Sequence, residues 1–294
     1  MSKKLLFIFN PYSGKGLIRE HLVSIVDIMV KAGYEVTIYP TQCKGDATRK
    51  VIEEAAGYDR IVCSGGDGTL DEVVAGFIEG EVDLPLGYIP AGSTNDFANS
   101  IGLPKDMEEA AKAAVGENEF PCDIGDFNGE SFVYVAAFGL FTEVSYETPQ
   151  EMKNLLGHAA YLLEGAKHLH EIPAYTFLVN NHGQIFQDEF IYGMITNSES
   201  VGGIKGMTGP NVDLSDGLFE VTLIKMPRNP IELNDILSYL TGLTDDTDMV
   251  YSFKTDELKL YSRGQVRWTL DGEYGGNHEE LLIRNLRQRI RIMV

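Results

Sequence analysis

The sequence has few cysteines and no hydrophobic run long enough to cross a membrane. Its three cysteines, Cys43, Cys63 and Cys122, are far apart and form no Cys-x-x-Cys pair. Neither a disulfide framework nor a cysteine zinc site is therefore indicated, and a reducing compartment such as the cytoplasm is the simplest expectation. The longest uncharged apolar run, Phe132 to Phe141, is about half of what a membrane-spanning helix needs. The apolar run from Leu5 to Phe9 is too short for a signal peptide.

Positive charge is also scarce. The chain carries 24 Lys and Arg residues against 44 Asp and Glu residues, a net charge of −20. This balance argues against non-specific nucleic-acid binding, which requires cations to neutralise phosphates. It also disfavours broad adhesion to anionic lipid, so any contact with a membrane must be peripheral, local and transient. Arg287, Arg289 and Arg291 could form a lipid-headgroup patch, but their alternation with other residues favours an exposed strand face.

The order of the secondary-structure signals divides the 294 residues into two parts. Strand and helix patterns alternate up to about Cys122, which predicts a parallel sheet covered by helices on both faces. Strand signals dominate from there on, and helical stretches near Glu151 to His170 and Pro230 to Leu240 interrupt them. We therefore expect an α/β nucleotide-binding domain over residues 1–125 and a β-rich substrate domain over residues 126–284.

Three predicted strands of the first part end in loops rich in Gly, Ser, Thr, Asn and Asp. These loops are Asn10-Pro11-Tyr12-Ser13-Gly14-Lys15-Gly16, Ser64-Gly65-Gly66-Asp67-Gly68-Thr69 and Pro90-Ala91-Gly92-Ser93-Thr94-Asn95-Asp96. Alternating strands and helices put all three loops at one edge of the sheet, where glycines let the backbone approach a ligand and helix N-termini favour anions. The sequence therefore predicts a polyphosphate site. The spacings match neither the P-loop nor the dinucleotide fingerprint.

At these residues the sequence resembles the bacterial diacylglycerol kinase and sphingosine kinase superfamily of lipid kinases. The segment Gly65 to Val74 is similar to the family signature, although its first five residues also occur in NAD kinases and phosphofructokinases. Asn10-Pro11-x-Ser13-Gly14, the loop from Pro90 to Ala98, and Leu270-Asp271-Gly272-Glu273 match three further family motifs in the expected order.

The resemblance implies an α/β domain of the NAD kinase/diacylglycerol kinase type, an all-β sandwich domain, and a cleft between them. Residues 285–294 are expected to return to the first domain. It further implies ATP as phosphate donor, Mg²⁺ as its metal ion, and a lipid alcohol such as diacylglycerol as acceptor. The nucleotide-binding residues carried over from the motifs are Asn10, Pro11, Ser13, Gly14, Thr41, Gly65, Gly66, Asp67, Gly68, Thr69, Thr94, Asn95 and Asp96.

A pair of carboxylates near the end of the chain is the candidate for proton transfer. Residues 266–271 alternate between apolar and polar, as in a half-buried strand. If this strand continues, Asp271 and Glu273 share its polar face, and two neighbouring carboxylates can adjust each other's pKa to suit a base. The resemblance indicates Glu273 as the proton acceptor, with Asp271 supporting it and Asp67 as the rival base. An Asp-Gly hairpin turn is the alternative reading of these residues.

Asp213, Asp216 and the main-chain carbonyl of Leu218 form a second candidate group. The resemblance implies that these oxygens bind a Mg²⁺ ion that orders a loop of the second domain. Their spacing is not that of an EF-hand, since Ile224 stands where the twelfth-position Glu would be. Spacing alone favours a solvated acidic turn at Asp216-Gly217.

Two other functions compete with lipid phosphorylation. An NAD kinase would share the second loop but not the late Asp-Gly-Glu motif. A sensor that binds nucleotide or lipid without catalysis would have no need of Asp67, Asp271 and Glu273. The sequence leaves the oligomeric state open, and a homodimer enters only as the commonest assembly of soluble proteins.

Overall fold

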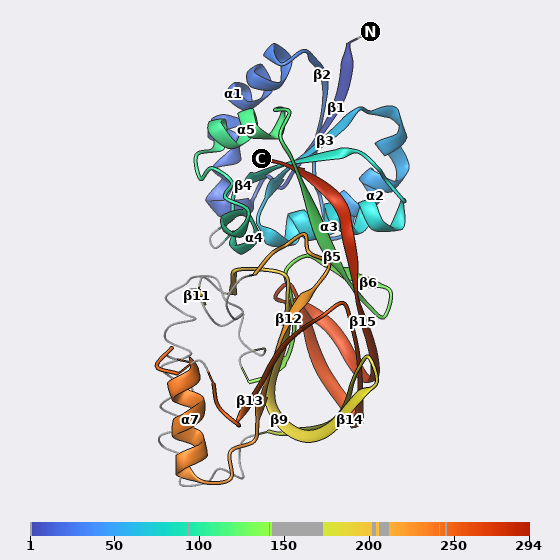
Figure 1. Cartoon of the computed structure of the whole chain (residues 1–294). Helices are drawn as coiled ribbons and strands as arrows, with labels where there is room; N and C mark the ends of the chain where they lie inside the picture. Colours follow the sequence, from blue (N-terminus) through green and yellow to red (C-terminus); the bar gives the residue numbers. More distant parts are fainter. Residues whose placement is uncertain are drawn as a thin grey trace. The chain divides into compact units, whose positions relative to one another are not determined.

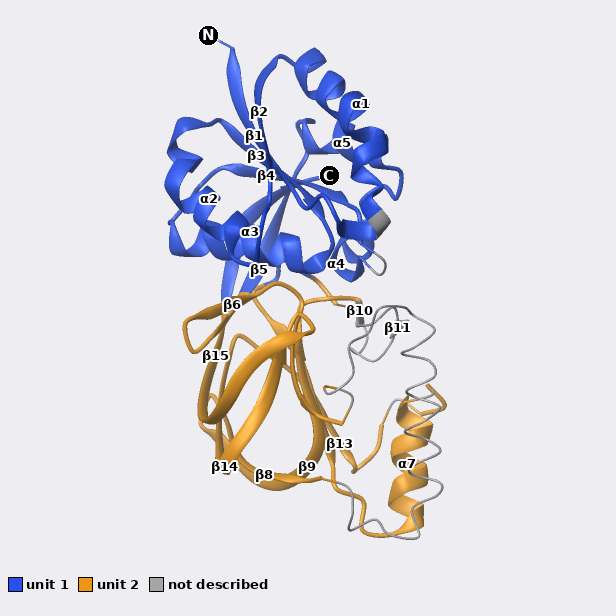
Figure 2. Cartoon of the chain, turned by 180° about the vertical axis from the view of Figure 1, so that it is seen from behind, with its two compact units in different colours: residues 1–124, 214–216, 286–294 blue, residues 125–213, 217–285 orange. Residues whose placement is uncertain are grey.

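The computed structural model describes residues 2–92, 95–140, 142, 173–201, 204–205, 212–240, 242–244 and 246–294 (Figure 1). The chain forms two compact units (Figure 2). Unit 1 comprises Met1–Ile124, Leu214–Asp216 and Leu286–Val294, and unit 2 comprises Gly125–Asp213 and Gly217–Asn285. The sequence-based division assigned residues 214–216 to the second domain. They belong to unit 1 because the Leu214 carbonyl accepts a 2.8 Å hydrogen bond from the main-chain N–H of Asp123.

The strands of unit 1 are hydrogen-bonded in the order β15-β4-β3-β1-β2, and each neighbouring pair runs parallel. The bounds are β1 Lys3–Phe9, β2 Tyr34–Pro40, β3 Arg60–Gly65, β4 Pro85–Pro90 and β15 Glu273–Met293. Only the last residues of β15, Arg291 to Met293, pair with β4. Because all these strands point the same way, the loops that follow β1, β3 and β4 leave the same edge of the sheet.

Helices cover both faces of this sheet, with α1 and α5 on one face and α2 and α3 on the other (Figure 1). Their bounds are α1 Ile18–Lys31, α2 Asp46–Glu54, α3 Asp67–Glu79, α4 Asp96–Ser100 and α5 Met107–Ala114; Ser13–Gly16 and Ala55–Gly57 form 3₁₀ turns. Every residue of β3 is buried, as expected for a parallel strand between two helix layers. Ile18, Ile25 and Met29, spaced along one stripe of α1, pack into the same core.

Antiparallel strands build unit 2. The described order is β13-β12-β9-β7-β14-β15, with β8 pairing β9 and β14, and β5 pairing β6 and β15. The bounds are β5 Glu119–Phe127, β6 Glu130–Phe132, β7 Val135–Gly139, β8 Tyr175–Asn181, β9 Gln184–Thr196, β10 Ser200–Val201, β11 Ile204–Lys205, β12 Phe219–Lys225, α7 Pro230–Leu240, β13 Val250–Thr255 and β14 Glu257–Leu270. Two strands belong to both units: β5 and β15 each begin in one unit and end in the other.

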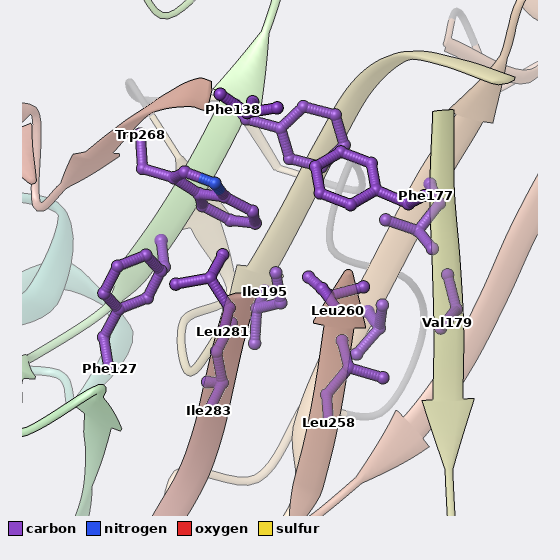
Figure 3. Close-up of a cluster of buried hydrophobic side chains, with 14 of the residues drawn as sticks. Phe127, Phe138, Phe177, Val179, Ile195, Leu258, Leu260, Trp268, Leu281 and Ile283 are labelled. Atoms are coloured by element: carbon purple, nitrogen blue, oxygen red, sulfur yellow. The ribbon is translucent and has the colours of Figure 1, made fainter. Parts of the chain in front are cut away.

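Aromatic side chains pack among aliphatic ones in the core of unit 2 (Figure 3). The Trp268 ring centroid lies 4.8 Å from that of Phe138 and 5.2 Å from that of Phe127, and Phe138 lies 4.7 Å from Phe177. These tilted ring pairs add to the gain from area burial alone. The strand predicted from the alternation of Val266, Trp268 and Leu270 is confirmed, and all three side chains are buried within β14. The expected polar face is exposed at Arg267 but not at Thr269, which is buried as well.

The apolar run that begins at Phe132 does not form one continuous strand, because β6 ends at Phe132 and β7 begins at Val135. The main chain between the two strands is hydrogen-bonded to the Asp271 carboxylate. The helix expected over residues 151–170 lies outside the described part of the chain. Within the described part, no helix combines the length and the hydropathy needed to cross a bilayer.

Candidate functional site

The loops after β1 and β3 are joined by hydrogen bonds. The main-chain N–H of Asn10 donates to the Ser64 carbonyl over 3.0 Å. The Ser13 hydroxyl oxygen accepts a 2.8 Å hydrogen bond from the main-chain N–H of Gly66. Ser13 thus uses its side chain to fix the backbone of a loop 53 residues away in the sequence.

The loop after β4 packs against both of these loops through glycines. The main-chain N–H of Ala91 donates to the Gly65 carbonyl over 2.7 Å. A Cβ atom on Gly92 would lie 2.8 Å from the Gly66 Cα, and one on Gly14 would lie 1.8 Å from the Ala91 carbonyl oxygen. Gly14 also has a φ of +54°, which an L residue adopts only with strain. The structure therefore brings the three predicted loops into direct contact at one sheet edge.

Asn95 shapes the third loop from within. Its side-chain oxygen accepts from the Gly92 N–H and its side-chain nitrogen donates to the Gly92 carbonyl, each over 2.9 Å. Its own φ is +51°, a conformation that Asn tolerates better than most residues. Asp96 follows as the first residue of α4 and is almost fully buried. Thr94, predicted to bind phosphate, lies outside the described residues.

Helix α3 begins directly at the second loop, with Gly66 as its N-cap and Asp67 as its first residue. The first turn of a helix presents N–H groups without intrahelical acceptors, and the helix dipole is positive at that end. Beneath the loop, the buried hydroxyl of Tyr88 donates to the Gly65 carbonyl over 3.2 Å. Burial, with a further contribution from the nearby Asp67 carboxylate, holds the pKa of Tyr88 well above its ordinary value, so this hydroxyl remains a donor.

Gly68, in the first turn of α3, has open space where a side chain would stand. Among the described residues, and apart from its chain neighbours and the backbone of its own helix, no atom lies within 4 Å of the position of its missing Cβ, and its φ is not in the positive region. The fold therefore gives no steric or conformational reason for glycine, which lowers helix stability relative to alanine. A ligand that approaches the backbone closely would need this space, and phosphate at a helix N-terminus is such a ligand.

Thr41, the remaining predicted nucleotide contact, follows β2 and lies beside the end of β1. Its main-chain N–H donates to the Phe9 carbonyl over 2.9 Å, and its hydroxyl lies 3.4 Å from the same oxygen. The residue is half-buried. The loop after β2 thus leaves the sheet at the same edge as the three glycine-rich loops.

The Asp-Gly-Glu motif forms a hairpin, so the expected continuation of the strand through it is wrong. Leu270 and Glu273 pair across the end of β14 and β15, and Asp271 and Gly272 are the two-residue loop between them. Their φ values of +50° and +85° are those of a type I′ turn. Asp271 and Glu273 consequently do not share the face of one strand.

The Asp271 carboxylate binds main chain. Its oxygens accept hydrogen bonds from the N–H groups of Val133 at 2.6 Å, and of Tyr134 and Val135 at 2.9 Å each. The Asp271 N–H donates back to the Val135 carbonyl over 2.8 Å. A buried carboxylate surrounded by N–H donors is stabilised in its ionised form. Asp271 therefore fastens the hairpin that carries the exposed Glu273, so the support expected of it comes through main-chain hydrogen bonds and not from a shared strand face.

Asp213, Asp216 and Leu218 lie in and beside a turn over residues 214–217, in which Gly217 has a φ of +86°. Two carboxylates and a carbonyl form an all-oxygen donor set, which fits a Mg²⁺ ion that keeps several water ligands. Within the described residues no cluster of three or more His, Cys, Asp or Glu side chains suits a metal, so such an ion would depend on the carbonyl and on water.

Sequence reasoning missed the two residues that anchor this turn. Asp123 is fully buried, and its carboxylate accepts a 2.7 Å hydrogen bond from the main-chain N–H of Gln288. The Gln288 side chain in turn donates to the Ser215 carbonyl over 3.1 Å. A charged residue directly after a buried cysteine, within a strand, was the available signal. Its partners are too distant in sequence to be inferred.

Two of the three alternating arginines, Arg289 and Arg291, make contacts within unit 1. Arg289 donates to the carbonyls of Phe77 and Val82 near the end of α3. Arg291 pairs with Asp83 at 2.9 Å and with Glu119 at 3.2 Å. Both guanidinium groups are thereby used within unit 1.

The sheet is parallel, three glycine-rich loops are in contact at its carboxyl edge, and the helix N-terminus at Gly68 is open. These features are typical of α/β proteins that bind phosphate groups.

Comparison with known proteins specifies the family. A family model of the diacylglycerol kinase catalytic domain matches residues 4–127. The chain is 34% identical to diacylglycerol kinase of Bacillus subtilis (strain 168), covering 93% of this chain and 91% of that protein. It is 33% identical to diacylglycerol kinase of Staphylococcus carnosus (strain TM300), covering 99% and 95%.

The crystal structure of a diacylglycerol kinase from Bacillus anthracis str. Sterne superposes with a TM-score of 0.78 at 26% identity, covering 99% of this chain and 97% of that one. The chain belongs to the diacylglycerol kinase family. It is a lipid kinase, a transferase of lipid metabolism, and the family implies ATP as its phosphate donor.

Proposed function

We propose that the chain transfers the γ-phosphate of ATP to the free hydroxyl of diacylglycerol, giving phosphatidic acid and ADP. The relatives named diacylglycerol kinase support this choice of lipid. The observation that carries the nucleotide half of the proposal is the open space at Gly68 in the first turn of α3. In this space the γ- and β-phosphates would meet N–H groups of the helix and of the neighbouring loops.

In the proposed reaction the acceptor hydroxyl oxygen bonds to the γ-phosphorus while the bond to the β-phosphate oxygen breaks. The hydroxyl proton passes to the Glu273 carboxylate, which is exposed on its hairpin and held there by Asp271. Positioning and charge stabilisation supply most of the catalysis of phosphoryl transfer. Bound Mg²⁺ would neutralise phosphate charge, with Asp67 as its candidate ligand, directly or through water.

A second Mg²⁺ is proposed at Asp213, Asp216 and the Leu218 carbonyl, in a structural role. From the scarcity of cysteine we infer that the protein works in the cytoplasm. From the net charge of −20 we infer that it meets the membrane peripherally and transiently, at its lipid substrate. A homodimer remains the default assembly, and nucleic acid is not a proposed partner.

The test is transfer of radiolabelled phosphate from ATP, with Mg²⁺, onto a panel of lipid alcohols in mixed micelles, beside soluble NAD. Wild type is compared with Glu273→Gln and Asp67→Asn, and with Glu279→Gln, an exposed carboxylate on the same strand as Glu273. We expect label on diacylglycerol, lost in the first two variants and kept in the third. Label on NAD alone would identify an NAD kinase. ATP binding without transfer, equal in wild type and Glu273→Gln, would identify a sensor.

A further inference from the structure

A fourth loop leaves the sheet edge where the three glycine-rich loops meet. It follows β2 from Thr41 to Gly45, and its residues Gln42, Cys43 and Lys44 are exposed. Its first residue is hydrogen-bonded to the Phe9 carbonyl at the end of β1. Since β2 lies next to β1, this loop borders the first glycine-rich loop, which follows β1.

Two carboxylates hold this loop, and they act on different parts of it. Asp46, at the start of α2, accepts a 2.8 Å hydrogen bond from the main-chain N–H of Gln42 and a 3.1 Å hydrogen bond from the Tyr39 hydroxyl. Arg49 donates to the same carboxylate over 2.6 Å. Each of these partners belongs to the loop or to the elements directly beside it, so Asp46 sets the internal shape of the loop.

Glu72 reaches the loop from another helix. One of its carboxylate oxygens accepts a 2.8 Å hydrogen bond from the Gly45 N–H, and the other lies 3.3 Å from the Ala47 nitrogen. Gly45 is the N-cap of α2, has a φ of +76° and makes no side-chain cap of its own. Glu72 therefore replaces the missing N-cap side chain, with the negative charge at the end of the helix that favours it.

Glu72 lies on α3, which begins at the second glycine-rich loop. Glu72 stands five residues after Asp67, and its carbonyl accepts a 2.8 Å hydrogen bond from the Thr48 hydroxyl. Helices α2 and α3 are also in close contact further on, because a Cβ atom on Gly76 would lie 2.7 Å from the Val51 Cβ. Glu72 thus connects the start of α2 to the helix whose N-terminus offers the open space at Gly68.

We propose that Glu72 is a positioning residue for the nucleotide, because it fixes the loop over residues 41–45 relative to the second loop as a fourth wall of the ATP site. This inference rests on the proposed function, since it assumes that ATP occupies the loops. Glu72 needs no contact with the substrate. Loss of the Glu72 carboxylate leaves the Gly45 and Ala47 N–H groups without their acceptor. The loop over residues 41–45 then shifts relative to the second loop, while Asp46 preserves the internal shape of the loop.

Glu72→Gln and Glu72→Ala test the proposal, with Glu79→Gln as control, since Glu79 is exposed in the last turn of the same helix. Equilibrium binding of a non-hydrolysable ATP analogue with Mg²⁺ is measured beside steady-state transfer to diacylglycerol and thermal unfolding. We expect the Kd of the analogue and the KM for ATP to rise about tenfold in Glu72→Ala, the equivalent of one charge-assisted hydrogen bond. The rise should be smaller in Glu72→Gln, which keeps one acceptor oxygen, and kcat should stay within about twofold.

An unchanged Kd in Glu72→Gln and Glu72→Ala, even with a lower melting temperature, would overturn the proposal and leave Glu72 a purely structural cap. A fall in kcat at unchanged KM would overturn it as well. If Glu72→Ala does not fold, Glu72→Gln decides the question by the same criteria. If the wild type binds the analogue but phosphorylates none of the lipids, the proposed function fails on its own, and the binding measurements still decide the role of Glu72.

Discussion

The hydroxyl oxygen of Ser13 accepts a hydrogen bond from the main-chain N–H of Gly66 at 2.8 Å, and this bond joins the first glycine-rich loop to the second. Ser13→Ala should lower the free energy of unfolding by about 1 kcal/mol and raise the KM for ATP several-fold, because the two loops lose their alignment. Ser24→Ala is the matched control, since its hydroxyl bonds only to the His21 carbonyl within α1. Urea unfolding and initial rates at varied ATP would measure both effects. An equal rise in KM for the two variants would contradict the prediction.

Gly68 and Gly14 should respond differently to alanine. At Gly68 the added methyl group meets no other element of the described part of the chain, so the variant should fold as stably as wild type, or up to about 1 kcal/mol more stably, yet bind ATP weakly. At Gly14 the methyl group would collide with the Ala91 carbonyl, and φ is +54°, so the variant should lose stability. Thermal unfolding with and without the ATP analogue separates the two cases. Unimpaired ATP binding by Gly68→Ala would remove the main support for phosphate at this turn.

Asp271 and Glu273 lie in one hairpin but should fail in different ways when substituted. Asp271→Asn replaces one acceptor oxygen by an amide donor next to main-chain N–H groups, which should cost about 3 kcal/mol of stability and activity with it. Glu273→Gln alters an exposed side chain, so the unfolding free energy should stay within about 0.5 kcal/mol while transfer is lost. Denaturant unfolding and transfer assays on the same preparations check this. A stable, active Asp271→Asn enzyme would contradict the role of the Asp271 hydrogen bonds in fastening the hairpin.

Acid stability should depend partly on Asp46. The hydrogen bond from the Gln42 N–H, aided by the Tyr39 hydroxyl and Arg49, holds the pKa of this carboxyl below its ordinary value of 3.8. A depressed folded-state pKa means that the unfolded chain binds this proton more readily. The stabilisation is therefore present above the ordinary value and is lost as pH falls through the lower, folded value. Asp46→Asn should be less stable than wild type at pH 6 and should lose less stability between pH 6 and pH 3. Urea unfolding at the two pH values measures the difference, and parallel losses in both proteins would contradict it.

The three loops could be located from sequence because residue type and strand–helix alternation are local signals. The turn at Asp271-Gly272 was equally local, but the alternation of residues 266–271 suggested that the strand continued, and the turn signal was the correct one. The hydrogen bonds that the Asp271 carboxylate accepts could not be predicted, since Asp271 and its partner Val133 are 138 residues apart. The same limit applies to Glu72 and Gly45, which come together only after two helices pack.

β15 begins at the hairpin of unit 2 and ends beside β4 in unit 1, where Arg291 to Met293 are the last strand of the described parallel sheet. Domains commonly fold as they emerge from the ribosome. Here β1 to β4 emerge long before the end of β15 is synthesised. Unit 1 therefore cannot complete its sheet when its first four strands have been synthesised. It must wait, with one edge of β4 uncovered, until the whole of the other unit has been translated.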